Sequence, residues 1–436
     1  MNTGSNTGEH PITAWLRTKP TIWFTLYAAV CAFCLYICVF AFRKTYTAAT
    51  FEGMVYWGVN YKVWLVVFQA VGYGLSKFIG IKVISELRTS RRKSGTLIMI
   101  TIAAVSWFFF AIVPPPYNIV FLFTNGLPLG MVWGIVFAYL EGRKVTEVLG
   151  AALSISFIFS SGLCRSAGSY LMQDWSVPEK WMPFAACGLF LLPLLLFLWL
   201  LDKIPPPSPE DEVLRTKRGP MSGKERIHFT KTFLPGIILF VLAYMLLTTF
   251  RDFRDNFSAE VWKGLGFGNS PSIYTRTEVP VSLIVFVVVG LIMFIRKNDK
   301  ALLVNHLIIA FGMLLIGIAT YLFESRFIDA VQWMILIGLG LYLGYVPYNC
   351  VFFERLLATF RYPGTVGFVI YIADSFGYLG SIAVLFYREF AFTNVSWLDI
   401  FIASGYYFSI IGFLLITGSM IYFQTKYKRG VAYQES

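Results

Sequence analysis

The sequence predicts an all-α integral membrane protein with twelve transmembrane helices in two six-helix halves. Of its 436 residues, 57% are hydrophobic and only 14% are charged, whereas soluble domains carry about 25% charged residues. The mean hydropathy is +0.66. About a dozen apolar stretches are long enough to cross a bilayer, which takes roughly 20 residues. One polar, proline-rich segment in the middle of the chain separates six of them from the other six.

The apolar stretches define the predicted spans and the domain organisation. The spans are 21–44, 61–85, 95–114, 116–140, 148–172, 182–202, 233–255, 272–295, 302–322, 331–353, 364–387 and 398–424. The corresponding regions are an N-terminal tail (1–20), a first half (21–202), a linker (203–232), a second half (233–425) and a C-terminal tail (426–436).

The basic residues predict the orientation of the chain in the membrane. Most of the 36 Lys and Arg residues fall in the two tails, the central linker and the alternate loops on the same side. Loops rich in Lys and Arg remain in the cytoplasm. We therefore expect both termini and the linker to be cytoplasmic, in a multi-pass protein of the inner (cytoplasmic) membrane.

Cysteine and histidine content argues against a disulfide framework and against a metal site. The six cysteines fall inside apolar stretches, and although Cys31, Cys34 and Cys38 share one helical face, the three histidines lie elsewhere. The net charge of +12 is explained by the loops, so no nucleic-acid partner is expected. We expect no cofactor and no bound metal.

Charged side chains inside the first half are the first candidates for function. A central Arg, Lys or Asp costs about 2.5–3.5 kcal/mol on insertion scales, and such residues mark functional sites in membrane proteins. Lys77 lies well along the second span, and Arg165 lies among small residues in the fifth. Arg43 follows the apolar first span. Lys77 could instead extend to the cytoplasmic surface, and Arg43 and Arg165 could be anchors near the outer ends of their spans.

The second half contributes charges of both signs. Arg251 and Arg254 stand at the end of the seventh span, beside Asp252 and Asp255, which could neutralise them. Asp374 lies in the middle of the eleventh span and needs a partner, for which an intramembrane cation is the simplest choice. The charges within the spans are mostly cationic, and a positive cavity with low-dielectric walls attracts anions. Guanidinium groups bind phosphate and carboxylate oxygens bidentately. The predicted substrate is an organic anion.

Several short motifs resemble those of the organophosphate:phosphate antiporters of the major facilitator superfamily, whose six-plus-six layout also matches. Tyr73-Gly-Leu-Ser-Lys77-Phe is similar to the second-span motif Y-G-x-S-K-F, and Arg43-Lys44 is similar to the first-span R-K. Arg251, followed by Asn256-Phe-Ser-Ala259, resembles R-x4-D-W-S-P, and residues 364–368 and 376–381 resemble the eleventh-span glycine motifs. The resemblance implies a phosphate ester as substrate, bound by Arg43, Arg251 and Lys77.

The chain also departs from that family, and two assignments stay open. Ser160 stands near the place of the family's fifth-span histidine, which makes it a further candidate in the cavity. A weak internal repeat pairs Arg43-Lys-Thr-Tyr-Thr-Ala48 with Arg254-Asp-Asn-Phe-Ser-Ala259, and it selects Arg254 rather than Arg251 as the second phosphate ligand. Asp252, Asp255 and Asp374 are the candidates for charge pairing or coupling.

Three functions are considered, of which the observations favour the first. The preferred one is a monomeric secondary active transporter that works by alternating access, through antiport or proton coupling, with the lipid bilayer and a small anion as its partners. The alternative is a receptor for an external organic anion, built on a transporter fold, with the linker as a docking segment. An enzyme is not expected, because the sequence has no clustered nucleophile, acid–base or metal-binding motif.

Overall fold

The structure is a computed structural model of the whole chain. It describes residues 10–86, 89–141, 143, 145–207, 211, 223–361, 367–391 and 395–430. The long helices are α2 (Thr21–Lys44), α3 (Tyr61–Glu86), α4 (Arg92–Ile112), α5 (Val120–Leu140), α6 (Thr146–Gln173), α7 (Met182–Leu201), α9 (Gly223–Asn256), α11 (Ile273–Met293), α12 (Asn298–Glu324), α13 (Ala330–Pro347), α15 (Gly367–Ala391) and α16 (Trp397–Lys428). The shorter elements are α1 (Pro11–Thr18), η1 (Thr45–Ala48), β1 (Val55–Tyr56), β2 (Val59–Asn60), η2 (Thr89–Arg91), η3 (Tyr117–Ile119), α10 (Ser258–Gly264), η4 (Tyr348–Phe352) and α14 (Phe353–Thr359).

The long helices confirm the predicted all-α membrane architecture. Ten helical segments of the described chain are long and apolar enough to cross a membrane. The helices α3 and α15, of 26 and 25 residues, also exceed the roughly 20 residues that a span needs. Backbone groups in lipid must be paired within the segment, which explains why the apolar stretches are helical.

Two segments differ from the prediction. The helix α9 begins at Gly223, well before the expected start near residue 233, because no helix breaker follows until Pro235. The tenth span changes to a π-helical turn, η4, directly after Pro347, and then continues as α14 to Thr359, past its expected end at residue 353. Proline removes a backbone donor, which favours such a local change of hydrogen bonding. Residues 208–210 and 212–222 of the predicted linker lie outside the described residues, and the linker's boundaries stay a prediction.

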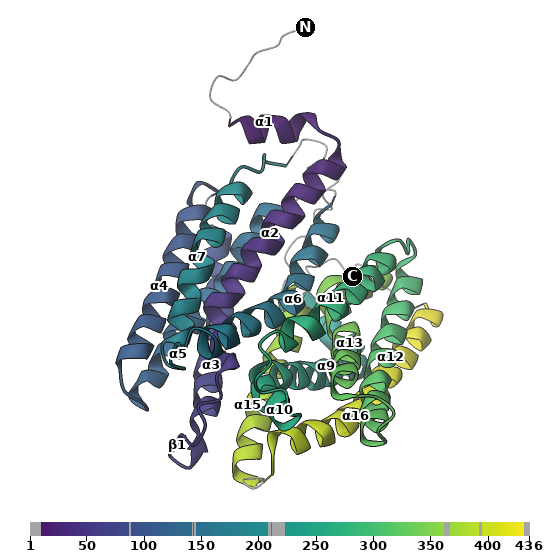
Figure 1. Cartoon of the computed structure of the whole chain (residues 1–436). Helices are drawn as coiled ribbons and strands as arrows, with labels where there is room; N and C mark the ends of the chain where they lie inside the picture. Colours follow the sequence, from purple (N-terminus) through teal and green to yellow (C-terminus); the bar gives the residue numbers. More distant parts are fainter. Residues whose placement is uncertain are drawn as a thin grey trace.

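The helices group into two bundles (Figure 1). In the N-terminal bundle, α3 packs along α5, and α2 packs against α6 and α7. In the C-terminal bundle, α12 packs against α13 and α16, and α9 packs against α15 and α16. The two bundles meet mainly where α6 packs along α11, and also where α3 contacts α15.

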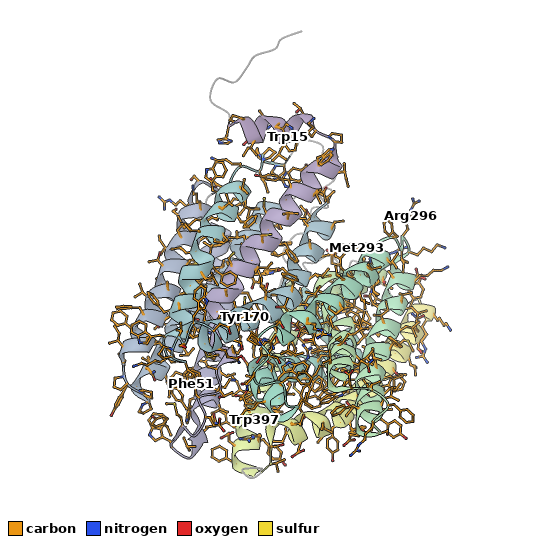
Figure 2. All side chains as sticks on the ribbon, in the orientation of Figure 1. Trp15, Phe51, Tyr170, Met293, Arg296 and Trp397 are labelled. Carbon is orange, nitrogen blue, oxygen red and sulfur yellow. The ribbon has the colours of Figure 1, made fainter. Side chains whose placement is uncertain are left out.

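The two ends of the molecule differ in structure. Trp15 and Arg296 lie toward the end where the N-terminal segment leaves the bundle, whereas Phe51 and Trp397 lie at the opposite end (Figure 2). We call these the terminal end and the far end. The connection at the far end between α2 and α3 contains the hairpin of β1 and β2, in which Val55 pairs with Asn60 and Tyr56 with Val59. Its turn contains Gly58 at φ +74°, a conformation that glycine adopts without steric cost.

Candidate functional site

Arg43 lies near the far end of α2 and faces the C-terminal bundle. Its guanidinium carbon stands 3.5 Å from the centre of the Tyr73 ring, in a cation–π contact with α3. The Nε atom of Arg43 is buried and has no hydrogen-bond partner, and within the described chain the structure gives its guanidinium neither a hydrogen bond nor an ion pair. The Arg43 side chain is half-buried, and a partly desolvated cation without such partners is unfavourable, so this group is suited to an added anion.

Tyrosines from both bundles surround this guanidinium. Tyr36, Tyr73 and Tyr378 are all within electrostatic range of Arg43, as is Asp252. The rings of Tyr73 and Tyr378 contact each other across the bundle interface, with centroids 6.1 Å apart. Phenol hydroxyls can donate hydrogen bonds to anionic oxygens, and aromatic faces stabilise cations, so the surroundings suit both Arg43 and an anion bound to it.

Arg251 presents the corresponding cation from the C-terminal bundle. Its guanidinium donates to Oδ1 of Asp252, with Nη2 at 2.7 Å and Nε at 3.1 Å, and lies 4.3 Å from the centre of the Tyr345 ring. Oδ2 of Asp252 accepts a hydrogen bond of 2.9 Å from Ser381. Tyr378 is within electrostatic range of Arg251 as well as of Arg43. We call Arg43, Tyr73, Tyr378, Arg251 and Asp252 the central cluster.

Asp374 lies beside the central cluster. Its Oδ1 accepts a hydrogen bond of 2.6 Å from the hydroxyl of Tyr244, and Tyr244 stacks on Tyr345 at 5.5 Å. Lys77, the remaining candidate, is on α3, but its side chain lies outside the described residues. The same holds for the motif at residues 364–368.

Arg254 has an environment different from that of Arg251. It is 1% exposed, and its Nη1 donates to Oε1 of Glu278 on α11 at 2.6 Å, while Nη2 donates to the carbonyl of Met334 at 3.2 Å. The expectation that Asp255 neutralises Arg254 is therefore wrong: the direct partner is Glu278. Glu278 was not among the predicted site residues, although its position as an acidic residue within the predicted span 272–295 indicates a functional or paired group.

Arg165 and Asp255 form an ion pair between the bundles. Nη2 of Arg165 on α6 stands 3.0 Å from Oδ1 of Asp255 on α9, and Nη1 donates to Ser258 at 2.7 Å. Ser161 also donates to Asp255, at 3.1 Å. Ser160, by contrast, is fully buried and donates to the carbonyl of Ser156 on its own helix. The structure thus separates Arg165 and Ser160 from the central cluster.

Two further cross-bundle contacts at the far end were not recognised in the sequence. Lys62, at the start of α3, is completely buried and stands 2.7 Å from Oε1 of Glu260 on α10. Lys44 donates to Oδ1 of Asn256 at 2.7 Å. We call the Lys62–Glu260, Arg165–Asp255 and Lys44–Asn256 contacts the far-end latch. Lys62 and Lys44 lie at predicted span ends, where a charge ordinarily faces water, which is why the sequence did not predict that they are inside the protein.

These pairs reduce the excess of positive charge expected within the spans. Arg165, Arg251, Arg254 and Lys62 each have a carboxylate partner. Among the described side chains, Arg43 and the neighbouring Lys44 then account for the excess positive charge near the central cluster. A cavity of about 540 Å³ lies elsewhere, against α6, α7 and the start of α11. Its lining contains hydroxyl groups and an indole but no charged side chain, so it has no cation to balance the charge of an anion.

Comparison with known proteins agrees with the fold. Three solved structures illustrate this: a D-xylose–proton symporter (17% identity, TM-score 0.55, 92% of this chain and 97% of the other), a mutant of the nucleoside transporter NupG (14%, 0.60, 91% and 99%) and a bacterial homologue of the human lysosomal transporter Spinster in an inward-facing, unoccupied conformation (14%, 0.58, 95% and 99%). Two structures of the xylose transporter XylE are also similar. One is of the major facilitator superfamily proton:xylose symporter bound to a bromodeoxyglucose, and the other is of the E. coli protein in an inward-open conformation. No curated protein sequence matches significantly.

The similarity in structure extends over nearly the whole of each chain, and it shows that this multi-pass membrane protein has the major facilitator fold. A family model matches residues 45–426, which is most of the sequence. The chain belongs to the family that this model describes, a family of unknown function (DUF5690).

Proposed function

We propose that the protein is a secondary active transporter that moves an organic anion, such as a phosphorylated metabolite, by alternating access. The observation that carries the proposal is the Arg43 guanidinium, which lies at the bundle interface without a hydrogen bond in the described chain. An anion placed between the bundles would supply the missing acceptors and would contact Arg251 from the other side. Guanidinium groups provide two parallel donors to phosphate or carboxylate, which favours an anion over a neutral solute.

The aromatic groups of the central cluster support a site that both bundles share. Tyr73 contacts Arg43 from the N-terminal bundle, and Tyr378 reaches toward Arg43 and Arg251 from the C-terminal bundle. A ligand bound by both bundles can draw them together, as alternating access requires. The named structures that share the fold are transporters of a sugar and a nucleoside and a relative of a lysosomal transporter, which supports transport as the activity.

Orientation and coupling complete the proposal. We place the protein in the inner membrane as a monomer, with both termini in the cytoplasm, so that the far end faces outward. In this orientation the far-end latch closes the outer side. Exchange with phosphate and coupling to protons are both compatible with the central cluster.

The test is uptake into proteoliposomes of labelled inorganic phosphate, glucose 6-phosphate and succinate, with glucose as the neutral comparison. We expect uptake of at least one anion and none of glucose. Arg43→Ala should lower that uptake about 10- to 100-fold, since charge-assisted hydrogen bonds contribute about 1.5–3 kcal/mol each. Arg296→Ala is the matched control, because Arg296 is exposed in the connection between α11 and α12 at the terminal end.

Three results would contradict this proposal or a part of it. Uptake of glucose but of no anion would show that the assigned substrate class is wrong. Saturable anion binding to the purified protein, without flux in liposomes, would favour the receptor. Unchanged anion uptake by Arg43→Ala would remove Arg43 from the site.

A further inference from the structure

Glu278 lies at the bundle interface and has no part in the proposed transport site. Among the described carboxylates it is the least exposed. It is 3% exposed, and while its Oε1 accepts from Arg254, its Oε2 is buried without a hydrogen-bond partner. The Nε of Arg254 is also without a partner. A buried ionised carboxylate needs full hydrogen bonding to offset its desolvation, so this pair is only partly satisfied.

The charged groups around Glu278 come from three neighbouring helices. Arg254 and Asp255 face it from α9, Arg165 from α6 of the other bundle, and the Tyr342 hydroxyl from α13 is within electrostatic range. The backbone of α6 approaches closely, because a Cβ at Gly162 would stand 2.8 Å from Cβ and Cγ of Glu278. Glu278 therefore touches the opposite bundle directly, at the level of the Arg165–Asp255 pair.

We propose that Glu278 is a proton-binding site that controls the opening of the far end. When Glu278 is ionised, it holds Arg254, and Asp255 remains available to Arg165 across the interface. A proton from water that binds Oε2 of Glu278 removes the negative charge that Arg254 faces. Arg254 then turns to Asp255, the other carboxylate within its electrostatic range, and competes with Arg165 for it.

This competition weakens the contact between the bundles. Arg165 on α6 and Asp255 on α9 are held together by one direct ion pair, supported by Ser161 and Ser258. If Asp255 turns toward Arg254, this part of the far-end latch is lost while the charges within the C-terminal bundle remain balanced. Protonation of Glu278 thus favours the state that is open at the far end. The role of this proton site in transport rests on the proposed transport function.

The first measurement needs no substrate. Hydrogen–deuterium exchange of the purified protein is followed at residues 45–60 and 257–272, at about pH 8 and about pH 5 with correction for intrinsic exchange rates. In the unmodified protein, exchange in both segments should rise at the lower pH. Glu278→Gln, which resembles the protonated state, should exchange at the higher level at both pH values, whereas Glu278→Asp should retain the pH response.

A matched control separates this effect from general loss of structure. Glu324→Gln changes an exposed carboxylate in the same bundle and should behave like the unmodified protein. Residues 298–324 of α12 should keep their exchange rate in Glu278→Gln. If these residues also exchange faster, the variant has lost structure. In that case Glu278→Asp is the deciding variant: the inference requires it to keep the pH response of the far-end segments, and loss of that response overturns the inference. A pH response that is absent from the unmodified protein, or the same in Glu278→Gln, overturns the inference.

The second measurement is exchange of labelled glucose 6-phosphate in proteoliposomes with equal pH on both sides. The exchange rate should depend on pH in the unmodified protein and in Glu324→Gln. In Glu278→Gln the part of the pH dependence that comes from the protein should be lost, and the part that comes from titration of the substrate phosphate should remain. An identical pH profile in Glu278→Gln and Glu324→Gln overturns the proton site. If no anion is transported by the unmodified protein, the proposed function fails, and hydrogen exchange alone decides the proton site.

Discussion

Arg251 and Arg254 lie three residues apart on α9, yet their surroundings differ. Arg251 is partly accessible at the bundle interface beside Tyr345 and Asp252, whereas Arg254 is enclosed in the C-terminal bundle by Glu278 and the carbonyl of Met334. The space around Arg254 is tight, since a Cβ at Gly338 would stand 2.8 Å from its Nη2. We infer that Arg251 serves the substrate and that Arg254 serves the bundle and its proton site.

Substitution of each arginine by Ala should separate these roles. Arg254→Ala leaves the buried Glu278 charge unpaired, and we expect a loss of about 3–5 kcal/mol in the free energy of unfolding. Arg251→Ala should keep the fold within about 1 kcal/mol and lower anion uptake about tenfold or more. Thermal unfolding in detergent and uptake in liposomes measure the two effects. A strongly destabilised Arg251→Ala with a stable Arg254→Ala would reverse the assignment.

The sequence predicted several of the charged residues within the spans but not their pairing. Arg43, Arg251 and Asp252 could be chosen because a charge in an apolar helix is costly. The partners of Arg165 and Arg254 could not be chosen, because pairing depends on the rotation of each helix and on contacts between helices far apart in sequence. Lys62 was missed because it stands at a predicted span end, and Glu278 was missed although it is an acidic residue within a predicted span. The short repeat favours Arg254 as a substrate ligand, whereas the ion pair of Arg254 with Glu278 favours Arg251.

At the scale of the elements, glycines allow the helices of the N-terminal bundle to approach closely. A Cβ at Gly72 on α3 would stand 2.4 Å from the carbonyl oxygen of Phe123 on α5, and one at Gly126 would stand 2.5 Å from that of Gln69. Small residues give such backbone contacts in membranes. This packing positions α3, and therefore Tyr73, against Arg43.

The two glycines that flank Tyr73 give a matched test. Gly72→Ala forces α3 and α5 apart, and we expect a loss of about 1–3 kcal/mol from overpacking, with weaker anion uptake because Tyr73 is displaced. Gly74→Ala places its methyl group in open space, with no atom within 4 Å, and should be nearly neutral. Thermal stability and uptake of both variants check this. Equal effects in the two would mean that the close contact does not position the site.

Element boundaries followed closely from hydropathy, because an apolar stretch in lipid has few alternatives to a helix. The predicted first span, 21–44, coincides with α2, and 182–202 differs from α7 by one residue. The start of α9 and the π-turn after Pro347 were not predicted, since they depend on helix continuation outside the apolar stretch and on local hydrogen bonding. The short β-hairpin at the far end was also missed.

At the scale of the molecule, the contacts between the bundles concentrate polar groups at the far end. Besides the far-end latch, Glu389 on α15 accepts a hydrogen bond of 2.8 Å from the backbone of Asn60, and Gln173 donates to the carbonyl of Gly268 at 2.9 Å. Ser166 on α6 contacts Thr275 on α11 at 2.7 Å. The structure therefore represents a state closed at the far end, with several polar contacts between the bundles there.

Lys62 and Glu260 are the pair best suited to test that closure. The Lys62 side chain is entirely buried and that of Glu260 is 12% exposed. If one charge is removed, the other is left without a partner in the closed state, whereas in the open state water can solvate it. Lys62→Gln should therefore disfavour the closed state by about 3 kcal/mol, or roughly a hundredfold in the ratio of closed to open molecules. The pair Lys263–Glu52 provides a control at the same end, because it is exposed and such pairs contribute about 0–1 kcal/mol.

Closure can be measured through a cysteine at a position that only opening exposes. Thr47 is 1% exposed and its carbonyl accepts from Lys62, so Thr47→Cys should react slowly with a water-soluble maleimide. Adding Lys62→Gln should increase that rate strongly, whereas adding Lys263→Gln should leave it nearly unchanged. The exchanged pair Lys62→Glu with Glu260→Lys should restore slow labelling, since it keeps the opposite charges while reversing them. Fast labelling in the exchanged pair, or slow labelling in Lys62→Gln, would mean that burial of apolar surface rather than this ion pair holds the far end closed.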